Sequence, residues 1–206
     1  MLVLSMAILF LIASHVVPSQ TTVREALIAA AGPQGFRIGY SLVSTLALLA
    51  VIAAYRNADG GPWLWTPGME DRYIALVLMP LAFFLLVCRF TQKPEIGQGI
   101  YRITTTPGSL AVLIWSLVHL MNVGEARTIL VFVGMLVIAL ASLVRNAGKV
   151  GHGLVGAIPF ARILSGRDRL ALREIGLWRP LLALVLTKLV LLLHPLVIGV
   201  DPLTGF

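Results

Sequence analysis

The sequence predicts an all-α membrane protein, a polytopic bundle of about six transmembrane helices. Of its 206 residues, 58% are hydrophobic and 12% are charged, with a mean hydropathy of +0.93. A soluble domain carries roughly 25% charged residues, so this composition excludes that class. Several windows without charge approach the roughly 20 residues that cross a bilayer. Lys and Arg are divided unevenly among the segments between these windows, which is typical of a membrane topology.

Six windows qualify as spans in a single transmembrane domain over residues 1–206. The first has no Lys or Arg before Arg24, so it lacks the charged start of a secretory signal peptide and is expected to remain as a helix. The last contains Lys188, whose long stem can reach an interface. The predicted spans cover residues 1–17, 38–55, 73–88, 107–123, 128–144 and 180–200.

The connecting segments predict the orientation of these spans. Twelve Lys and Arg residues fall on one side of the membrane, and three, Arg56, Arg72 and Arg127, fall on the other. The positive-inside rule places the twelve in the cytoplasm, which puts the N-terminus and the C-terminus outside. The formal net charge of +7 is therefore explained by orientation, and we expect no nucleic-acid partner.

The longest connecting segment is a basic cytoplasmic loop over residues 145–179. It is too short for a separate domain. Residues 151–161 are apolar and free of charge, and they suggest a re-entrant or interfacial piece. The residues that follow are rich in arginine and predict a basic surface helix over residues 167–174.

Three histidines, His15, His119 and His194, lie in the predicted spans, where an ionisable side chain is costly and is a candidate for function. The fourth, His152, is expected to be solvated in the cytoplasmic loop. His15 and His119 share helix faces with hydroxyl side chains, namely Ser5 and Ser19 in the first case and Ser109 and Ser116 in the second. Such faces suit helix packing. Two imidazoles in an apolar bundle also suit a bis-histidine haem.

Other kinds of site find little support in the sequence. The histidines and the single cysteine, Cys88, lack the spacing of a zinc site, and one cysteine excludes an intrachain disulfide. No phosphate-binding or dinucleotide-binding motif occurs. Every Asp and Glu lies in a loop or borders one, so a carboxylate pathway through the membrane has no residues to use.

Several short motifs occur together in a recognisable order. The first span ends in His-Val-Val-Pro (15–18), and the fourth contains Trp-Ser-Leu-Val-His (115–119) shortly before Asn122 and Gly124. Between and after them lie Tyr-Ser-Leu-Val-Ser (40–44), Tyr-Arg-Ile-Thr (101–104) before Pro107, Ile-Pro-Phe (158–160), Gly-Arg (166–167) and His-Pro (194–195). With these motifs the chain resembles the NnrU family of bacterial membrane proteins, which includes the 15-cis-zeta-carotene isomerases.

The resemblance implies a b-type haem with His15 and His119 as ligands of the iron. Under the predicted topology His15 lies near the inner end of its span, whereas His119 lies about 18 Å from the inner end of its own, at 1.5 Å per residue. His194 matches the depth of His119 better and is the substitute ligand. Arg37 and Arg102, near inner ends of spans, are candidates for binding the haem propionates, with topology markers as the alternative role.

Three functions follow from these expectations. The first is a haem protein of NnrU type in the inner (cytoplasmic) membrane of bacteria, with a redox or accessory role in denitrification and in nitrite and nitric oxide metabolism. The second is a haem-dependent isomerase acting on a lipid-soluble polyene. In that branch a cysteine lies three residues before the fourth-span histidine, where this chain has Ser116. The third is a non-catalytic structural or assembly subunit, which would contact partner helices and membrane lipid.

Overall fold

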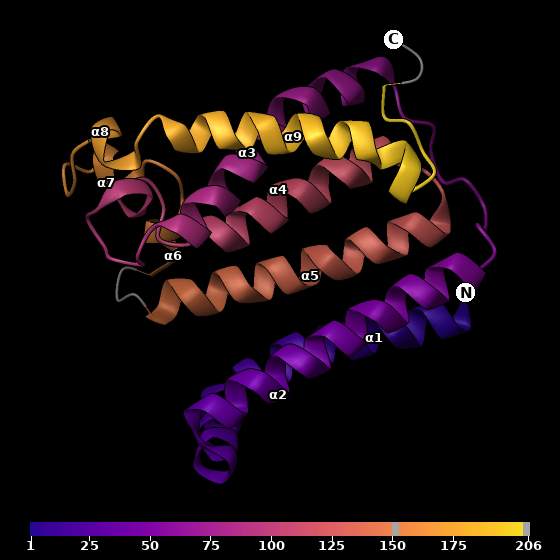
Figure 1. The fold of residues 1–206 in the computed structure, drawn as a ribbon, viewed down its shortest axis with the longest axis horizontal. Helices are drawn as coiled ribbons and strands as arrows, with labels where there is room; N and C mark the ends of the chain where they lie inside the picture. The colour runs from indigo at the N-terminus through magenta and orange to yellow at the C-terminus, as the bar shows by residue number, and fades with distance from the viewer. Residues whose placement is uncertain (150–152, 204–206) are drawn as a thin grey trace. The chain divides into compact units, whose positions relative to one another are not determined.

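The computed structural model describes residues 1–149 and 153–203, and it confirms the all-α class. In these ranges there is no β-strand, only an isolated bridge between Trp63 and Glu125. Five of the described helices are long and apolar enough to cross a membrane. They are α1 (Leu2–Val16) with the 3-10 turn η1 (Val17–Ser19), α2 (Thr21–Asn57), α3 (Met69–Thr91), α5 (Ala126–Lys149) and α9 (Trp178–Val197) (Figure 1).

The fourth predicted span is a shorter helix than expected. It is α4 (Pro107–Asn122), which is apolar and has 16 residues. At 1.5 Å per residue it is about 24 Å long, and a hydrocarbon core is about 30 Å thick. Five of the six expected spans are therefore confirmed by length and composition, and α4 occupies the place of the other. Together they indicate an integral membrane protein whose apolar helix surfaces contact lipid.

Helix α2 begins earlier than predicted, at Thr21 instead of residue 38. The search for windows without charge stopped at Arg37, but Arg24 and Arg37 are exposed and cost the helix little. Gly32 interrupts the helix with φ 71° and ψ 166°. Pro33 then starts the second segment, because a proline fits the first turn of a helix.

The loop between α5 and α9 also differs from its prediction. It contains only the short helices α6 (Gly153–Ala157), α7 (Ala161–Leu164) and α8 (Leu172–Ile175). The expected surface helix over residues 167–174 is wrong. The backbone amides of Arg167 and Asp168 both bond the Arg162 carbonyl, which makes a turn, and helix resumes only at Leu172. Residues 150–152, and with them His152, lie outside the described residues.

The described chain forms two compact units, each built from segments that are separate in sequence. Unit 1 comprises Met1–Thr66 and Val123–Ala141. Its core packs Leu4, Ile8 and Leu11 of α1 against the alanines of α2 at positions 47 and 54. Apolar residues three or four positions apart share a helix face, and small residues let helices approach closely. The loop after α2 is tied to the start of α5, where the Leu64 amide bonds the Gly124 carbonyl at 2.8 Å.

Unit 2 comprises Pro67–Asn122 and Ser142–Phe206. Helix α3 packs against both α4 and α9. At one end of these helices, the turn η2 (Gly99–Arg102) and α8 close over the core. Cys88 of α3 is completely buried there, beside Ile100, Tyr101 and Ile175. The other end of α4 is fixed by Asn122, whose amide donates to the Asp71 carbonyl at the start of α3 at 2.9 Å.

Candidate functional site

The three candidate histidines have the same local geometry. In each, ring nitrogen Nδ1 lies within hydrogen-bond distance of a backbone carbonyl. The partners are Leu11 for His15 at 2.9 Å, Trp115 for His119 at 2.8 Å, and Val200 for His194 at 2.7 Å. A carbonyl oxygen only accepts, so Nδ1 carries the proton, and in the neutral ring Nε2 then carries the lone pair. This is the tautomer with which a neutral imidazole binds a metal through Nε2, oriented by its second hydrogen bond.

His15 lies near the end of α1 in unit 1, and its ring is half-buried. The Ser14 hydroxyl donates to the Leu11 carbonyl at 2.8 Å and lies 3.1 Å from His15 Nδ1. The edge of the ring meets Tyr40 of α2, with centroids 5.9 Å apart and planes at 71°. His15 is therefore held by its own helix and by an aromatic side chain of the neighbouring helix.

Tyr40 is the end of a longer aromatic series in unit 1. Its ring stacks on Phe36 at a centroid distance of 6.0 Å, and the Arg24 guanidinium lies 4.9 Å above the Phe36 ring. The bend at Gly32 separates Arg24 from Phe36 along α2. Arg37, a predicted propionate ligand, is exposed on the same helix, where its Nε donates to the Pro33 carbonyl at 3.3 Å.

His119 and His194 both belong to unit 2. His119 is near the end of α4, and its ring lies 5.0 Å from that of Trp115, one helical turn earlier. His194 is near the end of α9, where the chain turns back so that Val200 accepts its hydrogen bond. The first-ranked ligand His119 and the substitute ligand His194 thus belong to the same compact unit. His15 belongs to the other unit.

The hydroxyl groups predicted to form polar faces are bonded within their own helices or to a neighbour. Ser5, Ser19 and Ser116 each donate to a carbonyl three or four residues earlier. Ser109 accepts from the Asn146 amide of α5 at 3.3 Å. Such bonds satisfy a hydroxyl without a ligand. Within residues 1–149 and 153–203, no three His, Cys, Asp or Glu side chains converge in a way that could hold a metal ion.

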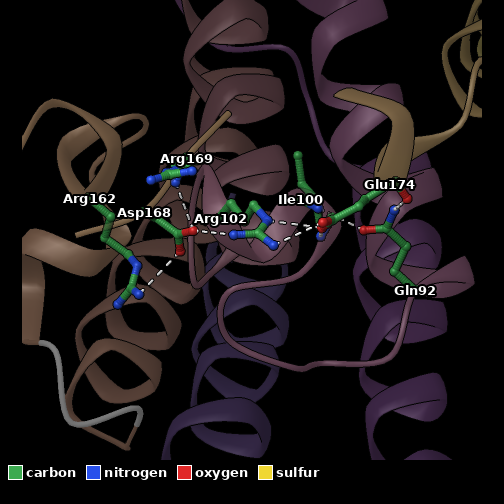
Figure 2. A network of polar contacts seen from close by, with 8 residues as sticks. Gln92, Ile100, Arg102, Arg162, Asp168, Arg169 and Glu174 are labelled. Atoms are coloured by element: carbon green, nitrogen blue, oxygen red, sulfur yellow. Dashed lines mark hydrogen bonds and ion pairs between the residues drawn. The ribbon is translucent and has the colours of Figure 1, made fainter. Parts of the chain in front are cut away.

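A network of charged residues that sequence reasoning missed lies at the other end of unit 2 (Figure 2). Arg102, just before α4, donates through Nε and Nη2 to the two carboxylate oxygens of Glu174, at 2.9 Å each. Its Nη1 pairs with Asp168. Asp168 also accepts from Arg162 at 3.3 Å. Arg102 is 66 residues from Asp168 and 72 from Glu174, so no local pattern could have indicated these two pairings.

The electrostatics of the network favour its charged state. The hydrogen bonds from Arg102 and from the Gly99 amide hold the pKa of Glu174 below its usual range. Burial tends to raise the pKa of Asp168, but the hydrogen bonds from Arg102, Arg169 and Arg162 outweigh it and lower that pKa. The same carboxylates raise the pKa of Arg102. An open polar cavity of about 680 Å³ adjoins the network, with Arg102, Glu174 and Arg179 in its lining.

Hydrogen bonds beside the network join two of the short motifs recognised in the sequence. The Phe160 amide donates to the Ile103 carbonyl at 2.9 Å, and the Thr104 hydroxyl donates to the Ala157 carbonyl at 2.8 Å. The segments Tyr-Arg-Ile-Thr (101–104) and Ile-Pro-Phe (158–160) therefore lie against each other. Their role in this fold is to dock the loop before α4 onto α6 and α7.

The apolar helices, and the charge network in the loops at one end of unit 2, define a helical integral membrane protein. Comparison with protein families identifies it further. A family model described as NnrU protein matches residues 1–202. The chain belongs to the NnrU family, as the motifs predicted. No curated protein and no solved structure matches it.

Proposed function

We propose that this NnrU family protein binds haem b within its membrane spans and has a redox or accessory role in denitrification, in nitrite and nitric oxide metabolism. The observation that carries the proposal is the shared geometry of the three span histidines. Each imidazole is oriented through Nδ1, and each presents Nε2 as the lone-pair nitrogen. Iron in a bis-histidine haem takes a neutral imidazole nitrogen of this kind.

The proposed ligands are His119 and His15, with His194 as the substitute for His15. The sequence resemblance favours His15, and the membership of His194 and His119 in the same compact unit favours His194. A bound haem would supply one-electron transfer and an iron to which nitric oxide can bind when a ligand leaves. The residues of the chain would orient the imidazoles, and the apolar helices would exclude water from the iron.

The two propionate candidates differ in their surroundings. All three guanidinium nitrogens of Arg102 are engaged by Glu174 and Asp168, so a propionate would have to compete with two carboxylates. Arg37 is exposed, and its described hydrogen bond is a long one to its own helix. Arg37 is therefore the better supported candidate of the two.

The ranking of redox function above polyene isomerisation rests on Ser116. Its hydroxyl is buried and donates to the Val112 carbonyl at 2.8 Å. A hydroxyl is not a soft ligand comparable to the thiolate of the isomerase branch. A change of iron ligand through this position therefore has no support.

The absorption spectrum of the purified full-length protein, before and after reduction with dithionite, tests the proposal. We expect a low-spin bis-histidine spectrum at one haem per chain. His119→Ala should abolish it, and one of His15→Ala and His194→Ala should convert it to a high-spin spectrum and thereby identify the second ligand. His152→Ala removes a histidine outside the spans and is the matched control, with an unchanged spectrum. Wild-type protein without haem at any stoichiometry would contradict the proposal and favour an assembly subunit.

A further inference from the structure

Residues 164–178, from the end of α7 to the start of α9, form a surface that is both apolar and basic. We call it the basic loop surface. Leu164 and Leu177 are each 84% exposed, and Leu172 is 65% exposed. The side chains of Arg167, Arg169 and Arg173 are exposed among them. Soluble surfaces seldom combine large exposed leucines with arginines in this way, whereas segments at a membrane interface do.

The acidic residues of this surface do not neutralise its exposed arginines. Asp168 and Glu174 are its only carboxylates. Asp168 forms ion pairs with Arg102 and Arg162, and Glu174 forms one with Arg102. Both arginines lie outside the surface. In the part of the chain that the structure describes, none of the side chains of Arg167, Arg169 and Arg173 forms an ion pair. The basic loop surface therefore carries three exposed positive charges without an ion-pair partner in the described residues.

The same ion pairs fix the backbone that carries these arginines. The carboxylate of Asp168 accepts from the Arg169 amide at 3.0 Å as well as from Arg102 (Figure 2). Glu174 anchors the start of α8, and the next residue, Ile175, is buried in the core of unit 2. The exposed guanidinium groups thus extend from an ordered loop, so less conformational entropy is lost when they bind a ligand.

The basic loop surface runs directly into the span α9. Trp178, the first residue of α9, is half-exposed, and the Arg179 guanidinium lies 4.5 Å above its ring. Tryptophan at the end of a span is typical of the membrane interface. The charged face is therefore placed at the level of lipid headgroups by the helix to which it is joined.

We propose that the basic loop surface binds the headgroups of anionic phospholipids, with the exposed leucines inserted among the acyl chains. A guanidinium matches the phosphate group in geometry and in charge. Clusters of basic residues next to a span attract anionic lipid surfaces, and each charge contributes. This inference does not depend on haem binding, because all of its residues lie outside the histidine sites.

Native mass spectrometry of the full-length protein tests the inference. The protein in detergent is mixed with equal amounts of dioleoyl phosphatidylglycerol and dioleoyl phosphatidylcholine, and the lipids that stay bound after release from detergent are identified. We expect the wild type to retain phosphatidylglycerol preferentially. Arg167→Gln/Arg169→Gln/Arg173→Gln should reduce that retention roughly tenfold or more, since each charge near an anionic surface contributes. Arg56→Gln removes an exposed charge elsewhere and should retain the preference.

A second variant separates the roles of charge and apolar contact. Leu164→Ser/Leu177→Ser should weaken retention of both lipids while keeping the preference for phosphatidylglycerol, and circular dichroism would verify that each variant is folded. Equal retention by wild type and triple arginine variant would overturn the inference. So would displacement of the lipid by inorganic phosphate alone, which indicates a simple anion site. A dimer peak lost in the leucine variant would overturn it as well, because a second copy of the chain would then cover the surface.

Discussion

Gly32 occupies the one backbone position of α2 that other residues cannot adopt cheaply. With φ 71° and ψ 166°, it lies in a region that only glycine populates readily. The bend that it allows lies between Arg24 and Phe36, whose side chains meet. Phe36 in turn supports Tyr40, and Tyr40 contacts His15. The backbone bend at Gly32 therefore influences the surroundings of the candidate ligand His15 through Phe36 and Tyr40.

Gly32→Ala should destabilise the protein by about 1–3 kcal/mol, the cost of holding a Cβ in that backbone region. Steric clash is not the reason, because an added Cβ meets no atom within 4 Å. Gly39→Ala is the matched control in the same helix. It also meets no atom within 4 Å, and it should be neutral or stabilising by up to about 1 kcal/mol. The midpoint of thermal unfolding in a neutral detergent measures both, and equal midpoints for the two variants would contradict the argument.

Individual candidate residues were predictable from the sequence to different degrees. His15, His119 and His194 stand out because they are ionisable side chains in apolar windows, and that signal is local. The orientation of each ring depends on a carbonyl of the folded backbone and could not be predicted. The partners of Arg102 were also beyond local reasoning, since Asp168 and Glu174 are distant in sequence and lie among seven basic residues.

At the scale of elements, composition predicted the spans well and their ends poorly. A window free of charge locates the middle of a span, but exposed Arg24 and Arg37 can continue a helix beyond it, as in α2. Arginine-rich residues 167–174 were predicted to be helical. They instead form a turn, in which the Asp168 carboxylate pairs with Arg102 and Arg162. Tertiary electrostatics thus overrode local propensity in the one loop where charges are dense.

The network that fixes α8 to the loop before α4 should make stability depend on pH. The pKa values of Asp168 and Glu174 are lowered in the folded state. Their contribution is therefore complete above the unfolded-state values, near 4. It is lost as the pH falls through the lower folded-state values. We expect the unfolding midpoint of the wild type to fall as the pH is lowered from about 5 to about 3.

Arg102→Gln provides the comparison for this pH dependence. Without the guanidinium, both carboxylates lose their main partner, so the unfolding midpoint should be lower at pH 7 and should change less between about pH 5 and about pH 3. Arg56→Gln removes an exposed arginine from unit 1 and should behave like the wild type. An unaltered pH profile in Arg102→Gln would show that the network does not govern acid stability.

At the scale of the whole molecule, the number of crossings decides where the termini lie. Among the residues that the structure describes, five helices are long and apolar enough to span, and α4 has 16 residues. If α4 crosses, as the topology predicted from basic residues requires, both termini lie outside. Helices shorter than the bilayer are accommodated by local thinning at modest cost.

Single cysteines introduced into a Cys88→Ser background test this topology. Leu2→Cys and Leu203→Cys should both react with a membrane-impermeant maleimide on intact cells. Leu164→Cys, which is 84% exposed and lies in the loop predicted to be cytoplasmic, should react only after the membrane is permeabilised. Labelling of only one terminus from outside would mean that α4 does not cross.

The distance in sequence between Arg102 and its carboxylate partners also limits when unit 2 can finish folding during synthesis. Glu174 follows Arg102 by 72 residues. At roughly 5–20 residues per second, several seconds of synthesis pass between them. During that interval α3 and α4 exist without the residues that close their end. Unit 2 therefore reaches its final form only when the last span is being made, and a chain truncated before residue 174 would leave Arg102 without its bidentate partner.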